Sequence, residues 1–148
     1  MSMIRFNMKA FFFDRKAVTD MVDKSAKKGL GYFGGVVRKI AKRSIVEAKN
    51  WFDHSRAGNP PKSHVGTLKR MIYYAWDPDH RSVVIGPELF SPMSGAPENL
   101  EHGGTAFIRR KKRVVRIAKR PFMQPAFEHE LEKLPLYVSG SLRGSNNA

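Results

Sequence analysis

The chain contains no cysteine and no long hydrophobic run. Without thiols it can form no disulfide, no thiolate metal site and no cysteine nucleophile, so the fold must depend on its apolar core. A bilayer-spanning helix needs about 18 or more apolar residues in succession, and no stretch approaches that length. Even the apolar start is interrupted by Arg5, Asn7 and Lys9. We therefore expect a soluble protein without a secretion signal.

Acidic residues are also scarce, with 13 Asp and Glu against 27 Lys and Arg, which gives a net charge of +14. A length of 148 residues fits one domain, and 41% hydrophobic residues are enough for a folded core. We predict a single domain over residues 1–138 and a disordered tail over residues 139–148. The charge imbalance favours a polyanionic partner, nucleic acid included, or an acidic protein surface.

The positive charge is concentrated in one segment. Eight of the twelve residues in 109–120 are Lys or Arg, and no carboxylate occurs between Glu101 and Glu128. The candidate contacts to DNA or to an acidic partner are Arg109, Arg110, Lys111, Lys112, Arg113 and Arg116. The alternative is a solvated tip that only maintains solubility. Few aromatic residues lie nearby, so any DNA contact should be to the backbone and independent of sequence.

The N-terminal part predicts a strand and then a long helix. Residues 4–10 alternate apolar and polar side chains, as in a strand with one buried face. Asp14 can cap the helix that follows, and apolar residues recur every three or four positions to about Glu47. Four glycines in 29–35 allow either a break into two helices or a continuous helix with a closely packed neighbour. The preserved phase of the apolar residues favours the continuous helix.

The middle of the chain predicts a loop and two hairpins. Residues 53–64 contain glycine and consecutive prolines and cannot continue a helix. The first hairpin has strands in residues 71–76 and 81–85, joined by a two-residue Pro-Asp turn. The second has strands in residues 106–110 and 113–118, and the cations form its tip. Between the hairpins, residues 88–104 predict an irregular segment with at most one short turn around residues 98–102. Gly103 and Gly104 should supply positive φ angles after that turn.

A final helix is expected near residue 123. Pro125 suits its first turn, and Pro135 should end it. Its predicted buried stripe consists of residues at helical spacing, namely Met123, Phe127, Leu131 and Leu134.

The histidines and carboxylates lack the spacing of a catalytic or metal site. No His-x-x-x-His pair occurs, and no glycine-rich phosphate loop is present. Asp77, Asp79 and His80 could hold a divalent ion, but a turn between strands explains them without one. We expect no metal and no cofactor.

A second cluster, Glu98, Glu101 and His102, could form an acid–base pair. No nucleophile or base-orienting group accompanies it, so ion pairs with nearby Lys and Arg explain these residues better. We therefore expect no enzyme activity.

Taken in order, five motifs resemble those of the tail-completion or neck proteins of tailed bacteriophages, which join head and tail and are often labelled minor tail component. After a long amphipathic helix, they are Gly58-Asn59-Pro60-Pro61, Val65-Gly66-Thr67-Leu68, Ser82-Val83-Val84-Ile85-Gly86-Pro87, Glu101-His102-Gly103-Gly104-Thr105 and Lys119-Arg120-Pro121-Phe122-Met123-Gln124-Pro125-Ala126-Phe127. The resemblance covers residues 14–134. The chain departs from the family in its basic tip, residues 109–113, and in an insertion over residues 88–97.

The resemblance implies an α+β protomer, similar to tail-terminator subunits, with a small, mainly antiparallel sheet packed against a long N-terminal helix and a C-terminal helix. It implies a structural virion protein that forms a ring, a hexamer, around the DNA channel at the head–tail junction, after assembly in the host cytoplasm. Its partners would be copies of itself, the neighbouring tail-terminator and head-completion, stopper or adaptor rings, and the DNA in the lumen, with no membrane.

The resemblance also assigns roles to residues. In this family the Glu-x-Gly element and the Arg-Pro-Phe block are structural, and no catalytic residue is known. The candidate ring or neck interface comprises Asn59, Pro60, Pro61, Lys62, Glu98, Glu101 and His102. The competing hypothesis is a basic, sequence-independent DNA-binding module of a mobile element.

Overall fold

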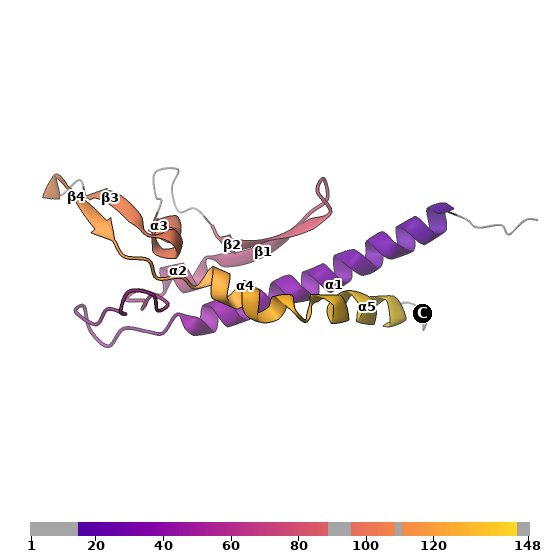
Figure 1. The fold of residues 1–148 in the computed structure, drawn as a ribbon, viewed down its shortest axis with the longest axis horizontal. Coiled ribbons are helices and arrows are strands. Elements are labelled where there is room, and N and C mark those ends of the chain that lie inside the picture. The colour runs from indigo at the N-terminus through magenta and orange to yellow at the C-terminus, as the bar shows by residue number, and fades with distance from the viewer. Residues whose placement is uncertain (1–14, 89–95, 109–110, 145–148) are drawn as a thin grey trace, which may run out of the picture.

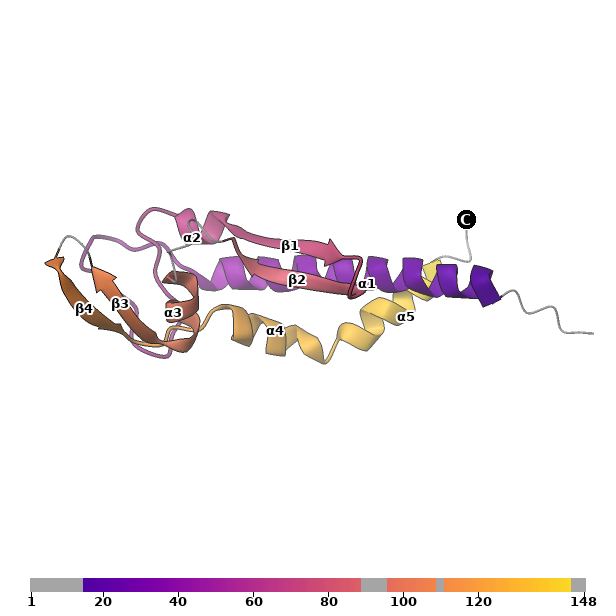
Figure 2. The same ribbon diagram turned by 90° about the horizontal axis from the view of Figure 1, so that it is seen from above.

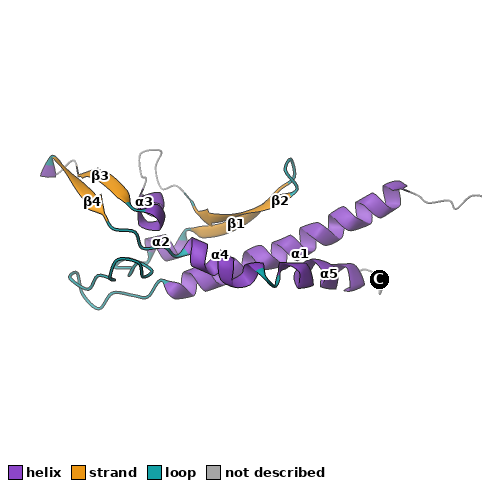
Figure 3. Cartoon of the chain, viewed as in Figure 1, coloured by secondary structure: helices purple, strands orange, loops and turns teal. Residues whose placement is uncertain are grey.

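The computed structural model describes residues 15–88, 96–108 and 111–144. Its elements follow one another as α1 (Arg15–Ser44), α2 (Thr67–Arg70), β1 (Ile72–Asp77), β2 (Ser82–Pro87), α3 (Ala96–His102), β3 (Gly104–Ile108), β4 (Arg113–Ile117), α4 (Met123–Leu131) and α5 (Leu134–Gly144). The chain is α+β, as predicted, and its strands form two separate antiparallel pairs (Figures 1 and 3). The expected strand over residues 4–10 and the expected cap Asp14 lie outside the described residues.

The helix α1 is continuous over 30 residues, through all four of its glycines. A Cβ atom at Gly29 would lie 2.8 Å from the Cα atom of Val138 in α5. A Cβ atom at Gly34 would lie 3.1 Å from the ring of Tyr74 in β1. Each glycine weakens the helix by about 1 kcal/mol relative to alanine, but here it allows backbones and rings to approach closely. The continuous helix with closely packed neighbours is thus confirmed.

The end of α1 comes at Ser44, slightly before the expected Glu47. There the chain pairs with the end of the following loop instead of continuing the helix. The N–H of Ser63 donates to the carbonyl of Val46 at 2.8 Å, and the N–H of Ala48 donates to the carbonyl of Ser63 at 3.0 Å. As predicted, residues 53–64 form a loop without helix or regular strand.

The hairpin β1–β2 packs along α1 (Figure 2). Its register runs from Ile72 opposite Pro87 to Asp77 opposite Ser82, which confirms the first predicted hairpin. Four residues connect the strands, rather than the expected two-residue turn. The Oδ1 atom of Asp77 accepts hydrogen bonds from the N–H groups of Asp79 at 3.0 Å and His80 at 3.3 Å, so turn chemistry accounts for this cluster.

The core lies along one face of α1. It consists of the buried side chains Phe33, Val37, Ala41, Ile45, Ile72, Phe122 and Ala126. Against these seven stand seventeen large hydrophobic side chains that are exposed within the described part of the chain. Where such side chains lie next to one another on the surface, they are candidates for contact with another molecule.

The C-terminal helices differ from the prediction. In α4 the buried residues are Ala126 and Glu130, whereas Phe127 and Leu131 are 41% and 43% exposed. Met123 and Leu134 of the predicted stripe are half-buried and pack against the core, but between them the buried residue is Ala126, one position before Phe127, because its small side chain fits beside α1. Pro135 does not end the helical region: it is the second residue of α5, where its missing N–H group costs nothing.

The predicted disordered tail is also corrected. The helix α5 extends to Gly144 and packs along α1, with the rings of Tyr32 and Tyr137 5.0 Å apart. Residues 139–144 are therefore helical, because tertiary contacts outweigh their Gly and Ser content. Residues 145–148 lie outside the described part.

The helix α3 begins at Ala96 and ends at His102, so it is longer than the single turn expected around residues 98–102. Gly103 follows with a φ of 78°, as predicted, and its N–H donates to the carbonyl of Asn99 at 2.9 Å. The same prediction for Gly104 is wrong, because this residue begins the extended strand β3. The second hairpin, β3–β4, then projects from the body near the C-terminal end of α1 (Figures 1 and 2). Within the described residues, no helix is long and apolar enough to cross a membrane.

Candidate interaction surfaces

The basic hairpin presents its cations to solvent. Lys111, Lys112, Arg113 and Arg116 are exposed, and none of them takes part in the ion pairs found among the described residues. The predicted contacts Arg109 and Arg110 lie outside the described residues. The described cations are therefore available to a phosphate or carboxylate from another molecule.

The two faces of this hairpin follow from its register, because directly opposite residues of antiparallel strands lie on the same face. Thr105 pairs with Arg116 and Phe107 pairs with Val114, so these four side chains share one face. Phe107 is 62% exposed and Val114 is 65% exposed. We call these four residues the arm face.

The loop that carries Asn59, Pro60, Pro61 and Lys62 is fastened to the body. The N–H of Gly58 donates to the carbonyl of Lys119 at 2.8 Å. Asn59 is exposed and Pro60 is half-buried, but Pro61 is buried, so its place in the predicted interface is corrected to a structural one. Lys62 forms an ion pair with Asp53. The backbone N–H of Lys49 and this lysine together lower the pKa of Asp53.

Glu101 was predicted to pair with basic side chains, and that prediction is wrong; its place at an interface stays a prediction. Its side chain is buried, with the residue 8% exposed. Its carboxylate accepts hydrogen bonds from the N–H groups of Phe122 at 3.0 Å, Met123 at 3.1 Å and Gln124 at 2.8 Å. Glu101 thus satisfies free N–H groups at the start of α4, where the helix dipole also favours a negative charge.

This cap connects two motifs that the resemblance implied to be structural: the Glu-x-Gly element, which contains Glu101, and the Arg-Pro-Phe block, which contains Phe122. Phe122 is 1% exposed, and Arg120 donates from Nε to the carbonyl of Ser55 at 3.1 Å, which holds the loop against the segment before α4. Glu98 and His102 remain exposed, so these two predicted interface residues are accessible.

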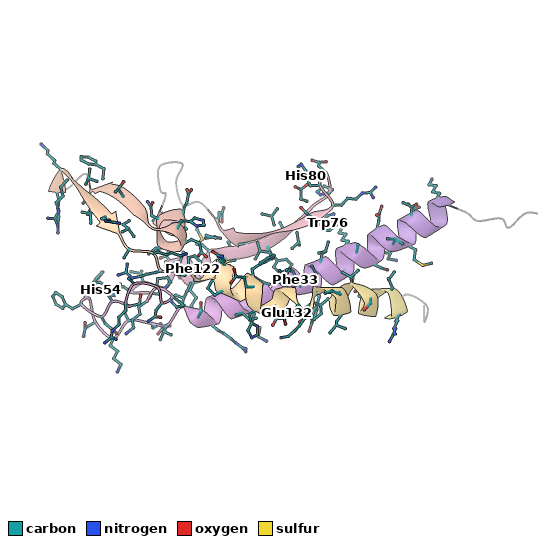
Figure 4. All side chains as sticks on the ribbon, viewed as in Figure 1. Phe33, His54, Trp76, His80, Phe122 and Glu132 are labelled. Atoms are coloured by element: carbon teal, nitrogen blue, oxygen red, sulfur yellow. The ribbon has the colours of Figure 1, made fainter. Side chains whose placement is uncertain are left out.

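A histidine pair in the loop was not predicted from the sequence. Nε2 of His64 lies 3.4 Å from Nδ1 of His54, and the ring of His64 stacks on Trp51 with centroids 5.5 Å apart. His54 and His80 lie toward opposite ends of the molecule (Figure 4). No group of three or more metal-ligating residues occurs within the described ranges. Ten residues separate His54 and His64, so only the closure of the loop brings them together.

An open groove of about 350 Å³ lies between α1, β2, α3 and α4. Its walls are mainly apolar, formed by Val37, Ile85, Met123 and Phe127 together with the cap Glu101, and the exposed His102 and Gln124 lie at its rim. We call it the α4 groove. The sequence pattern does not reveal it because its walls come from four elements far apart in the chain.

Comparison of the chain with models of protein families, with curated proteins and with solved structures finds no match.

Proposed function

We propose that this chain is a structural subunit of the neck of a tailed bacteriophage. Copies of it would form a ring that completes the tail and joins it to the head connector around the DNA channel. The order of the motifs from residue 58 to residue 127 supports the phage family. The observation that carries the proposal is the protruding hairpin β3–β4, on which the apolar side chains of Phe107, Ile108 and Val114 and the described cations are exposed.

An isolated two-stranded hairpin is at best marginally stable in water. Here the apolar pair Phe107 and Val114 faces solvent on such a hairpin. A subunit that completes its packing against a neighbour explains this exposure, whereas a protein that functions alone gains nothing from it. Ring formation through different faces of neighbouring copies meets that need.

The cations at the tip suggest a contact at the junction. Lys111, Lys112 and Arg113 would face either the DNA in the lumen or an acidic ring above or below. Both contacts are electrostatic and would weaken with added salt.

A variant in which Arg110, Lys111, Lys112 and Arg113 are all changed to Gln distinguishes the two contacts. If the partner is an acidic ring, particles with this variant should fail to join tails. If the partner is DNA, rings should form normally and DNA retention should become weaker and less dependent on salt. Normal joining and retention at every salt concentration would contradict both.

A matched control removes the same charge from a different surface. It changes four exposed lysines of α1 to Gln: Lys16, Lys24, Lys28 and Lys39. This control should leave joining and DNA retention close to those of the wild type, because its charges lie outside the hairpin.

The net charge of +14 favours one alternative, a basic DNA-binding module that acts as a monomer. Purified protein that binds duplex DNA tightly at physiological salt without self-association would support this module. Rings with weak DNA binding would support the neck subunit.

A further inference from the structure

Two unpartnered surfaces of the protomer are complementary to each other. The arm face is an apolar pair, Phe107 and Val114, next to a cation, Arg116. The α4 groove is a concave apolar surface, and two exposed carboxylates, Glu98 and Glu128, lie one helical turn from its rim residues. The complementarity of these two surfaces identifies a candidate contact between copies.

The arm has the dimensions of a docking element. Its strands have five residues each, which at about 3.4 Å per residue gives a ribbon about 17 Å long. It projects beyond the rest of the fold (Figure 1). Its apolar side chains therefore lie where a second molecule can cover them.

The groove carries the opposite charge. Glu98 lies four residues before the rim residue His102, and Glu128 lies four residues after the rim residue Gln124, so each carboxylate shares a helix face with a rim residue. Both glutamates are exposed. Glu128 accepts a hydrogen bond from Gln124 at 2.8 Å, which holds it on the same side of α4.

We propose that the arm face of one copy occupies the α4 groove of the next copy. This inference rests on the proposed ring and specifies its contact: Phe107 and Val114 cover the apolar walls, and Arg116 meets Glu98 and Glu128. Because arm and groove are different surfaces, the contact is heterologous, and it gives a closed ring when the rotation between successive copies closes. Two arms packed on each other would instead bring like charges together, which disfavours a symmetric dimer.

Charge reversal tests the contact. An arm variant carries R116E, and a groove variant carries E98K and E128K; all three side chains are exposed, so both variants should keep the wild-type unfolding midpoint. Each variant alone brings like charges together at every contact, and its association should weaken about 100-fold. Sedimentation velocity measures the loss as a shift from rings to protomers.

Mixing the two variants gives the decisive result. In an equal mixture, each acidic arm can meet a basic groove and each basic arm can meet an acidic groove, so alternating rings should form again. A control with E47K and D79K adds the same charge as the groove variant at exposed positions away from the groove, and it should form rings as the wild type does.

The outcomes separate this contact from the proposed function. Wild-type rings that both variants leave intact, or that the mixture fails to restore, would overturn the arm-in-groove contact and leave the ring subunit standing. A wild type that never associates would overturn the proposed function itself.

Disulfide cross-linking between engineered cysteines gives a second, independent measurement of the contact. Because the chain has no natural cysteine, any disulfide must join the engineered positions. A V114C/Q124C variant, one cysteine on the arm face and one at the groove rim, should oxidise to a ladder of linked chains. The single variants V114C and Q124C should form no ladder. A double variant that remains a single chain after oxidation would count against the contact.

Discussion

At the scale of single residues, two glutamates hold the C-terminal half in place. Glu101 reaches across the fold to cap α4, because Phe122 at the cap position offers no hydrogen-bonding side chain. Glu130 is buried at the other end of α4 and is surrounded by donors. Both carboxylates are therefore bound by hydrogen-bond donors of the fold itself.

Replacing Glu101 by Gln should destabilise the protein by about 2 kcal/mol, because buried N–H groups lose a charged acceptor. Glu98 in the same short helix is exposed, so E98Q is the matched control and should change stability by less than about 0.5 kcal/mol. Urea unfolding of the three proteins measures both values. Equal stabilities for E101Q and E98Q would show that the cap contributes nothing.

Glu130 should make stability depend on acid pH. Hydrogen bonds from Lys133 at 2.8 Å and Tyr137 at 2.7 Å lower the pKa of Glu130 to about 2. Since the folded pKa lies below the ordinary value of about 4.3, the stabilisation is complete above pH 4.3 and is lost as the pH falls toward 2. The thermal unfolding midpoint, followed from neutral to acid pH, should decline in this window.

Tyr137 gives the opposite dependence at alkaline pH. Its hydrogen bond to Glu130 raises the pKa of Tyr137 to about 12, so its stabilisation is complete below pH 10 and is lost as the pH rises toward 12. In Y137F this alkaline loss should disappear, and the acid decline should become smaller and end at a higher pH, because the pKa of folded Glu130 is then lowered less. Unchanged profiles in Y137F would refute the coupling between these two residues.

At the scale of elements, α1 is the support on which β1–β2, α4 and α5 pack. Three of its four glycines, Gly29, Gly34 and Gly35, face a neighbouring element closely. Gly29 meets the backbone of α5 at Val138, whereas nothing lies within 4 Å of a Cβ atom built at Gly31. The two positions therefore predict opposite effects of the same substitution.

G29A should destabilise the protein by about 1–3 kcal/mol, since the added methyl forces α5 away from α1. G31A should stabilise it by up to about 1 kcal/mol, because alanine favours the helix and meets no neighbour. Chemical denaturation of both variants is the measurement. A stabilising G29A would mean that α5 does not pack against α1 at this point.

Elements with a strong local pattern were predictable from the sequence, namely α1 and the two hairpins. The sequence did not show which face of α4 is buried, because that depends on how closely α1 approaches Ala126. It also did not show that Pro135 starts a helix, since the packing of Tyr137 on α1 decides this. The capping role of Glu101 and the α4 groove both depend on contacts between distant segments, so the sequence pattern did not reveal them. The lack of a capping side chain before α4 is a signal that could have indicated a cap from elsewhere in the chain.

At the scale of the whole molecule, the protomer is an elongated body with a small core and a protruding basic arm (Figures 1 and 2). The arm separates two tasks. Its face carries the apolar pair suited to a neighbouring copy, and its tip carries the cations suited to DNA or an acidic ring. If DNA is the partner of the tip, variants of the tip should weaken salt-sensitive DNA binding and leave the ring assembled. Variants of the arm face should cause the ring to dissociate into protomers.

The central claim is that the chain functions as a ring, and the mass of the native assembly tests it most directly. Native mass spectrometry of purified protein should give one closed oligomer, for a hexamer about 101 kDa, six times the protomer mass of 16.8 kDa. The mass should stay fixed as the concentration rises, because a closed ring has no free contact left. A protein that remains at 16.8 kDa at every concentration, and binds duplex DNA in that form, would contradict the account.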